Sequence, residues 1–367
     1  MHESTNIEIS DFRAYRYELP LQQALPVKGG SAATRVGFVL KIVDHDGVAG
    51  WGDVAPLPGV SREQPGQTAQ QCMNVVANPS QWGRIAAGRR FLYTLFPSVH
   101  FGIDCALAMI RAHREGVSVA RHLNPHAPGG VAVNALLSGT DDEILKQASS
   151  LAQKGYRAAK LKVGRRQPEA DAELVGAVRA ALGGQMDLRL DANRAWDLQA
   201  ACRFSERVAA GSFTYIEEPL KEVAELDDLV ERTGMPIALD ESLSDPELRA
   251  PLGTVGYVAL VMKPTMLGGF SQIERWVEIA TQRKIGIVFS SSFESGLGLL
   301  HIANLAAALA SDLPAGLDTA SAFQQDILSP RPLVTDGYFA TGQRFQDDFH
   351  LVAERLFELK ATHQTDL

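Results

Sequence analysis

Cysteine is scarce in this 367-residue chain, and long apolar runs are absent. The cysteines form neither a CxxC pair nor a zinc-ligand spacing, so we expect free thiols in a reducing compartment at Cys72, Cys105 and Cys202. Apolar runs such as 255–262 and 305–310 are far shorter than the roughly 20 residues of a membrane-spanning helix. The N-terminal stretch lacks the basic and apolar regions of a secretory signal. These shortages predict a soluble, cytoplasmic protein.

Basic residues are outnumbered as well. Lys and Arg total 35 against 43 Asp and Glu, which gives a formal net charge of −8. Such a chain has no surplus of positive charge to neutralise phosphate groups, so nucleic acids and anionic membranes are not expected partners. The 46% hydrophobic and 21% charged residues are typical of a globular protein and exclude disorder and coiled coil. We expect a small-molecule partner, and the sequence leaves the oligomeric state open.

The N-terminal part, residues 1–125, has the pattern of an α+β domain. Two β-rich runs flank Asp46-Gly47, a dipeptide typical of hairpin turns. Apolar residues between 103 and 110 follow at helical spacing. The less regular segment 321–367 is expected to return and pack on this domain.

Residues 126–320 alternate between short apolar runs and amphipathic stretches of helix length. Strands are predicted at 131–137, 158–163, 186–190, 213–216, 236–239, 257–262 and 285–289, with an eighth at 315–317 left open. This βα repetition is typical of a parallel sheet, and the number of units fits a closed (β/α) barrel better than an open sheet. A dinucleotide-binding fold loses its main support because no G-x-G-x-x-G follows any strand.

Charged residues lie where consecutive predicted strands end. They are Lys160 and Lys162, then Asp191, Glu217, Asp240 and Lys263. The two lysines are two positions apart, so on a strand they point to the same face. Each interval in the series accommodates one strand, one helix and two loops. We therefore expect all six at the C-terminal ends of the barrel strands, where barrel enzymes have their active sites.

Three converging carboxylates would repel one another without a cation. Oxygen ligands with no His or Cys nearby favour a hard divalent ion, Mg²⁺ before Mn²⁺. A desolvated lysine near such an ion has a lowered pKa and can act as a base. The set therefore predicts proton abstraction next to a carboxylate, through an enediolate. One acid alone would be read as a helix cap, and Glu218 and Glu241 are expected to serve as capping or supporting groups.

The same residues resemble the enolase superfamily, in its muconate-lactonising subgroup. The matching motifs are K-x-K at Lys160, D-x-N at Asp191, E-E-P at Glu217, D-E-S at Asp240 and M-K-P at Lys263. The resemblance implies a modified (β/α)7β TIM-type barrel under an α+β capping domain. It also implies that the three acids bind Mg²⁺ and that Lys162 faces Lys263 across the substrate.

Longer strings are similar to the o-succinylbenzoate synthase family: RLDANRAW at 189–196, SSSFESGLGL at 290–299 and GLDT at 316–319. That resemblance implies syn-dehydration of 2-succinyl-6-hydroxy-2,4-cyclohexadiene-1-carboxylate to 2-succinylbenzoate, a step of menaquinone biosynthesis. Lys162 would remove the proton and assist departure of the hydroxyl. Lys263 would remain an ammonium across the ring, and Lys160 would lower the pKa of Lys162.

Other residues carry two readings each. Ser290, Ser291 and Ser292 either bind the succinyl carboxylate or serve as turn and N-cap residues. Glu294 is either a group that supports Lys263 from behind, without touching the substrate, or a capping acid. The segments 19–35 and 51–59 are expected to cover the barrel mouth and set specificity. Trp51 is either a contact in that lid or a packing residue.

Two other kinds of function remain open. On the same scaffold, a dipeptide epimerase or N-acylamino acid racemase would use Lys162 and Lys263 as two bases on opposite faces. That function is disfavoured because dipeptide epimerases usually carry a D-x-D motif near the eighth strand. The corresponding residues of this chain, 316–319, contain one acid. A muconate-type cycloisomerase is less favoured still. A non-catalytic barrel that only binds a ligand would be expected to lack one of the acids or lysines, and none is missing.

Overall fold

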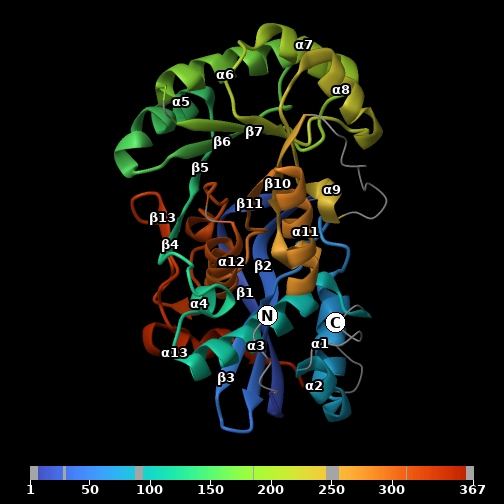
Figure 1. Cartoon of the computed structure of the whole chain (residues 1–367), viewed down its shortest axis with the longest axis vertical. Coiled ribbons are helices and arrows are strands. Elements are labelled where there is room, and N and C mark those ends of the chain that lie inside the picture. The colour runs from blue at the N-terminus through green and yellow to red at the C-terminus, as the bar shows by residue number, and fades with distance from the viewer. Residues whose placement is uncertain are drawn as a thin grey trace.

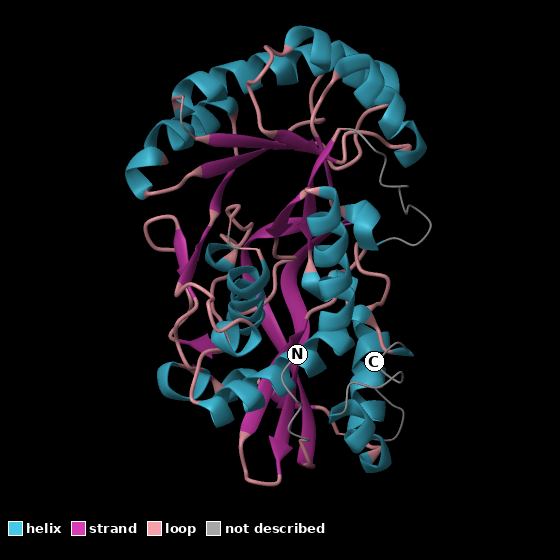
Figure 2. Cartoon of the chain, in the orientation of Figure 1, coloured by secondary structure: helices cyan, strands magenta, loops and turns pink. Residues whose placement is uncertain are grey.

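The computed structural model describes residues 7–27, 30–86, 94–184, 186–244, 256–310 and 312–360. The two larger sheets lie one beyond the other along the long axis of the molecule (Figure 1). One is antiparallel and the other is parallel and curled, with helices along its outer side (Figure 2). This arrangement confirms the predicted α/β fold with a barrel-type sheet and a separate set of capping strands.

The antiparallel sheet has the order β15-β1-β2-β3. Its strands are β1 (Ile9–Val27), β2 (Gly30–Asp44), β3 (Ala49–Val54) and β15 (Phe357–Glu358). The predicted hairpin joins β2 to β3, and the carboxylate of Asp44 accepts the amides of Asp46 and Val48 across the turn. Gly47, with φ of 84°, occupies the left-handed region that this turn requires.

Helix α3 (Pro97–Glu115) packs directly on β3 because glycines meet at the contact. A Cβ on Gly52 would lie 1.7 Å from the carbonyl oxygen of Gly102, so only glycine allows this approach. The helix ends at Gly116, which is left-handed. The remaining helices before the barrel are α1 (Pro65–Val76), α2 (Pro79–Ala86) and α4 (Val119–Leu123).

The parallel sheet has the order β11-β10-β9-β8-β7-β6-β5. Its strands are β5 (Asn134–Leu137), β6 (Ala158–Lys162), β7 (Asp187–Asp191), β8 (Tyr215–Glu217), β9 (Ile237–Leu239), β10 (Tyr257–Met262) and β11 (Gly286–Phe289). The longer helices that follow strands are α5 (Asp141–Ser150), α6 (Pro168–Leu182), α7 (Leu198–Arg207), α8 (Leu226–Thr233), α11 (Phe270–Arg283) and α12 (Gly296–Leu309). Two short helices, α9 (Glu241–Ser244) and α10 (Pro264–Leu267), directly follow β9 and β10. Six of the seven predicted strands, those from 158–163 to 285–289, are therefore present, with ends that differ by up to two residues.

Residues 315–316 close the curled sheet into a barrel. The amide of Asn134 donates to the carbonyl of Ala315, and the amide of Ser291 donates to the carbonyl of Gly316. Parallel bridges join Val133 to Ala315 and Ser290 to Gly316. The eighth strand that the sequence left open is thus a short bridge between β5 and β11.

One predicted strand was wrong as a single element. The run 131–137 divides into β4 (Gly130–Ala132) and β5, which belong to different sheets. β4 pairs antiparallel with β13 (Tyr338–Ala340), outside the barrel. The apolar run is continuous because both halves are buried, and apolar content alone does not show a change of partner.

The C-terminal residues contribute short elements: β12 (Leu328–Ser329), α13 (Phe345–Asp348) and β14 (His350–Leu351). β15 then pairs with β1, where Tyr15 lies opposite Glu358. On the pairing of β15 with β1 we propose the domain limits 1–125 and 126–320, with 321–367 added to the first, while β13 in that segment pairs with β4 of the second. Residues 361–367 lie outside the described part of the chain.

Buried polar groups join the antiparallel sheet to the barrel. Arg35 is 1% exposed and donates to the carbonyl oxygen of Phe293 at 3.0 Å and to that of Ala55 at 2.6 Å. Asp53 accepts the hydroxyl of Tyr17 at 2.8 Å and both the amide and the hydroxyl of Ser295 at 3.0 and 2.9 Å. Burial raises the pKa of Asp53 to about 7 against these hydrogen bonds.

This shift predicts a fall in stability with rising pH. Between about pH 4 and pH 7, folded Asp53 holds a proton that the unfolded chain releases, so the free energy of unfolding falls by up to roughly 4 kcal/mol across that window. Asp53→Asn should remove this fall, because an amide can turn its oxygen toward Ser295 and its NH₂ toward Tyr17. Urea unfolding of both proteins from pH 4.5 to 8 gives the difference, in which other titrations cancel. A pH-independent difference would contradict the prediction.

Within the described residues, no helix is long and apolar enough to cross a membrane. The predicted free thiols are confirmed, with Cys72 and Cys105 buried and Cys202 partly buried. The cytoplasmic location stays a prediction.

Candidate active site

The six predicted residues lie at the same edge of the barrel. In the parallel register Lys162 lies beside Asp191, and Asp191 beside Glu217. Asp240 directly follows β9, and Lys263 directly follows β10. Sequence spacing therefore brings these side chains to the C-terminal strand ends, as expected.

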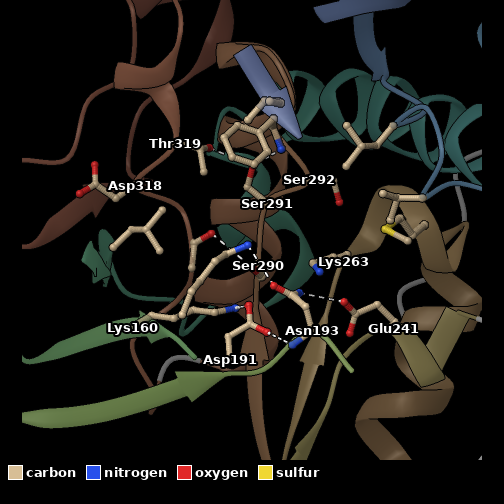
Figure 3. Close-up of a pocket in the computed structure, with 18 of the residues that line it drawn as sticks. Lys160, Asp191, Asn193, Glu241, Lys263, Ser290, Ser291, Ser292, Asp318 and Thr319 are labelled. Atoms are coloured by element: carbon tan, nitrogen blue, oxygen red, sulfur yellow. Dashed lines mark hydrogen bonds and ion pairs between the residues drawn. The ribbon is translucent and has the colours of Figure 1, made fainter. Parts of the chain in front are cut away.

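A cavity of about 370 Å³ opens at this edge (Figure 3). Lys160, Lys162, Asp191, Lys263 and the three serines 290–292 all line it. Glu217 and Asp240 are 2% and 3% exposed and lie beneath the lining residues. Glu241, which was expected to be a capping or supporting group, also lines the cavity, as do Leu25 and Leu57 from the segments 19–35 and 51–59. The other lining residues were given no individual role from the sequence: Val60, Asn134, Leu136, Arg165, Asn193, Met266, Phe293, Gly316, Asp318 and Thr319.

Two ammonium groups form ion pairs with the three acids. The Lys160 Nζ lies 2.8 Å from an oxygen of Asp191 and 2.5 Å from one of Glu217. The Lys263 Nζ lies 2.5 Å from Asp240. Burial acts to lower the pKa of each lysine, but the nearby carboxylates outweigh it, so the pKa of both lies above its ordinary value. Both lysines are therefore ammonium ions at neutral pH.

The pKa values of the three acids are shifted in different directions. Burial raises the pKa of Glu217, and Asp191 adds to that rise through like charge. Burial also raises the pKa of Asp240, to which Glu241 and Glu217 add. Burial acts to raise the pKa of Asp191 as well, but Lys160 and Lys162 reverse the shift, and its pKa is lowered. The three carboxylates thus lie within electrostatic reach of one another.

In the part of the chain that the structure describes, no group of three or more His, Cys, Asp or Glu side chains is arranged to hold a metal ion. The carboxylates form ion pairs with Lys160 and Lys263 instead, which differs from the expected arrangement around a metal ion. The residues still fit a divalent ion: three buried oxygen donors, mutually repelling, have flexible ammonium groups as their positive partners. Movement of the Lys160 ammonium would free two of these donors.

Lys162 has a different environment from the other two lysines. Its Nζ donates to the side-chain oxygen of Asn193 at 3.1 Å. Burial lowers the pKa of Lys162, Asp191 opposes this, and Lys160 and Arg165 add to the lowering. The expected effect of Lys160 is therefore present but smaller than that of burial. Lys162 is the lysine of the cavity suited to accept a proton.

Asn193 was quoted as part of D-x-N but was given no role from the sequence. Its backbone, at φ of 45°, is in the left-handed region, and its amide donates to Asp191 at 3.0 Å. Its side-chain NH₂ donates to Glu241 at 3.1 Å (Figure 3). Glu241 therefore fixes the amide whose oxygen meets Lys162. The neighbouring acid Glu218 accepts the amides of Asp240 and Ser242, a capping role as expected.

The structure shows different surroundings for the serines 290–292 and Glu294, for each of which the sequence left two roles open. The Ser291 hydroxyl donates to Glu294 at 2.7 Å, whereas the Ser292 hydroxyl is buried in the cavity wall without a hydrogen-bond partner. Glu294 has its described hydrogen bonds with Thr265, Ser291 and Ser292, so it meets the short helix α10 that follows Lys263, as a group supporting that lysine from behind would.

Trp51 packs away from the cavity. Its ring lies 6.1 Å from that of Tyr15, and its carbonyl oxygen meets His301 Nε2 at 2.8 Å. The packing reading is therefore the correct one. The two capping segments nevertheless reach the cavity, through Leu25 and Leu57.

Two further cavity residues escaped sequence reasoning. Arg165 follows β6 by three residues and lowers the pKa of Lys162, and Asp318 accepts the hydroxyl of Tyr156 at 2.6 Å. The signal at Asp318 was its place in GLDT beside the closing bridge. Arg165 carried no signal, because a charged residue in a loop is usually only solvated.

A parallel barrel with carboxylates and lysines on successive strand ends defines a class of enzyme, the enolase superfamily. A family model described as "Enolase C-terminal domain-like" matches residues 143–344, and one described as "MenC, N-terminal domain" matches 9–110. The o-succinylbenzoate synthase of Pectobacterium atrosepticum is 32% identical over 321 residues, which cover 87% of this chain and 93% of that protein. That of Pasteurella multocida is 31% identical over 335 residues, or 89% and 94%. The chain belongs to the o-succinylbenzoate synthase family of this superfamily.

Solved structures share the fold at lower identity. The L-Ala-D/L-Glu epimerase of Bacillus subtilis has a TM-score of 0.78 at 20% identity, covering 91% of this chain and 96% of its own. A dipeptide epimerase of Enterococcus faecalis, complexed with Mg and a dipeptide, has a TM-score of 0.79 at 20% identity, covering 96% and 100%. These likenesses confirm the predicted fold, and membership of the family confirms the prediction of an enzyme. Use of a divalent metal follows from the same membership.

Proposed function

We propose that the chain is an o-succinylbenzoate synthase, which dehydrates 2-succinyl-6-hydroxy-2,4-cyclohexadiene-1-carboxylate to 2-succinylbenzoate in menaquinone biosynthesis. The observation that carries the proposal is the unlike pair of lysines in one cavity. Lys162 has a lowered pKa and Lys263 a raised one. Three strands separate β6 from β10 along the sheet, so the two amines face the cavity from opposite sides of the barrel.

Asp191, Glu217 and Asp240 would hold Mg²⁺, with Mn²⁺ a possible substitute. The metal, when bound, supplies positive charge that stabilises the oxygens of an enediolate. The donor set, three carboxylates on adjacent strands with no His or Cys among the described residues of the cavity wall, supports a hard ion. The catalytic steps themselves belong to the lysines.

Lys162, neutral at the start, takes the proton next to the substrate carboxylate at its Nζ. The bond to the 6-hydroxyl then breaks, and the same ammonium returns the proton to the departing oxygen, which leaves as water. One base on one face accounts for a syn elimination. Lys263 stays charged on the other face and stabilises the electron-rich ring. Formation of the aromatic ring makes the step favourable.

The test is a comparison of substrates on one preparation. The protein with Mg²⁺ is offered the hydroxycyclohexadiene acid and, separately, L-Ala-D/L-Glu and N-succinyl amino acids in D₂O. Loss of the diene absorbance with little deuterium entry into the amino acids is the expected result. Fast deuterium entry without dehydration would overturn the proposal.

The second candidate is a dipeptide epimerase or N-acylamino acid racemase, favoured by the opposed positions of Lys162 and Lys263. Racemisation needs each lysine to act once as base and once as acid. The Asp240 carboxylate holds Lys263 as an ammonium, which suits one direction of proton transfer only. This asymmetry supports the dehydratase over the racemase.

The neighbourhood of Lys162 gives a prediction for the pH profile. Arg165 lowers the pKa of Lys162 by like charge, so Arg165→Gln should raise it and move the acidic limb of kcat/KM to higher pH by roughly half a unit. Arg166→Gln is the matched control, since Arg166 pairs with Asp141 and Asp171. Equal profiles for the two variants would contradict the prediction.

A further inference from the structure

Glu294 is a buried acid that the proposed chemistry does not use. It is fully buried, and its carboxylate accepts three hydrogen bonds. One oxygen accepts the hydroxyl of Thr265 at 2.7 Å. The other accepts the hydroxyl of Ser291 and the amide of Ser292, both at 2.7 Å. Charge-assisted bonds of this length, out of water, hold their partners firmly.

These partners come from two different strand ends. Thr265 lies in α10, two residues after Lys263, and the serines lie in the segment 290–293 that follows β11 and forms one wall of the cavity. Ser291 also meets the hydroxyl of Thr319 at 2.9 Å, next to the bridge that closes the barrel. Glu294 therefore ties the serine segment to the turn of Lys263.

The same segment is held from the capping side. The carbonyl of Phe293 accepts a bond from Arg35, and the amide of Ser295 donates to Asp53. Phe293 itself has φ of 60°, a conformation that a bulky residue keeps only where its surroundings impose it. The segment 290–293 is thus held by hydrogen bonds from the capping sheet and from the barrel, and Glu294 accepts those on the barrel side.

We propose that Glu294 is a positioning residue, which sets the distance between the 290–293 wall and Lys263 and so determines how tightly the cavity holds the part of the substrate remote from the ring carbon that loses its proton. This inference rests on the proposed function. Glu294 touches neither the cavity nor the reacting atoms, and it acts through Ser291, Ser292 and Thr265.

The variants separate hydrogen bonding from charge. Glu294→Gln can keep all three bonds, with its oxygen toward the serines and its NH₂ toward the hydroxyl oxygen of Thr265. Glu294→Ala loses all three and frees the wall. We expect Glu294→Ala to raise KM by roughly tenfold or more and Glu294→Gln to restore it to within about threefold of the parent.

Asp326→Ala is the matched control. Asp326 is also a buried acid, and its carboxylate accepts the amide of Gly296, the first residue of α12. It does not line the cavity. Its loss should lower the melting temperature and leave KM unchanged. A merely structural role for Glu294 would give the same pattern in Glu294→Ala. That result, or equal KM values for the Ala and Gln variants, would overturn the proposal.

Two further measurements cover the remaining cases. If Glu294→Ala does not fold, Thr265→Val removes one of the three bonds at constant shape, and KM should still rise by about threefold. An unchanged KM there counts against the proposal. If the parent protein does not dehydrate the diene acid, the proposed function fails separately. Hydrogen exchange of the 290–295 amides then decides, since it should be faster in the Ala variant than in the Gln variant.

Discussion

Replacement of Lys162 by alanine is expected to lower kcat for dehydration on the order of 10³ to 10⁴-fold. Lys162 is the cavity lysine whose pKa lies below its ordinary value, because burial outweighs the effect of Asp191, and it is proposed to act first as base and then as acid. Its Nζ contacts Asn193, whereas Lys160 and Lys263 contact the acids. Removal of Lys162 should therefore leave the metal site and the fold unchanged. Assays that follow the diene absorbance measure the loss of kcat. Calorimetric titration with Mg²⁺ measures the affinity of the metal site.

Lys162→Arg is the companion variant. A guanidinium keeps the positive charge and much of the length but does not release its proton near neutral pH. Both variants should fail equally if proton transfer is the role of Lys162. An arginine variant with near-normal turnover would reduce that role to charge alone. Normal turnover in the alanine variant would remove Lys162 from the chemistry.

The second large effect concerns the metal. Chelation of divalent ions should reduce turnover to less than about one thousandth, and added Mg²⁺ should restore it. Glu217→Gln should give a similar loss that added Mg²⁺ only partly reverses, because a neutral amide is a weaker ligand than a carboxylate. Calorimetry should show a weakened metal site in this variant. Full activity in the presence of a chelator would exclude the proposed cofactor.

Glu218→Gln gives the matched control at the adjacent position. Glu218 is also a buried acid, and its oxygens accept Asp240 and Ser242, including the Ser242 hydroxyl at 2.7 Å. An amide can keep these bonds by donating to that hydroxyl. Metal affinity should therefore change little. If both variants bind the metal equally weakly, the loss of one negative charge in the region explains the effect. Glu217 would then not be a metal ligand.

Much of the barrel could be predicted from the sequence because its signals are local. Apolar runs mark β5 to β11, and charged residues mark the points where the strands leave the core, such as Lys160 and Glu217. Parallel strands bring these points to one edge whatever the loops between them do. For that reason the neighbours in the register could be expected without knowledge of the packing.

The remainder depends on contacts between distant residues. The two-residue bridge at 315–316 is too short for any periodicity. The division of 131–137 between two sheets depends on β13, which lies two hundred residues further along the chain. The pairing of Lys160 with two acids and the cluster around Glu294 depend on distances that no spacing along the chain gives.

The sheet order β15-β1-β2-β3 has a consequence for synthesis of the protein. Strand β1 is translated long before β15, so its outer edge at Tyr15 and Arg16 gains its partner only when 357–358 has been translated. The nascent chain therefore carries an unpaired edge throughout elongation. Folding of this sheet is completed after, and not before, the intervening barrel has emerged.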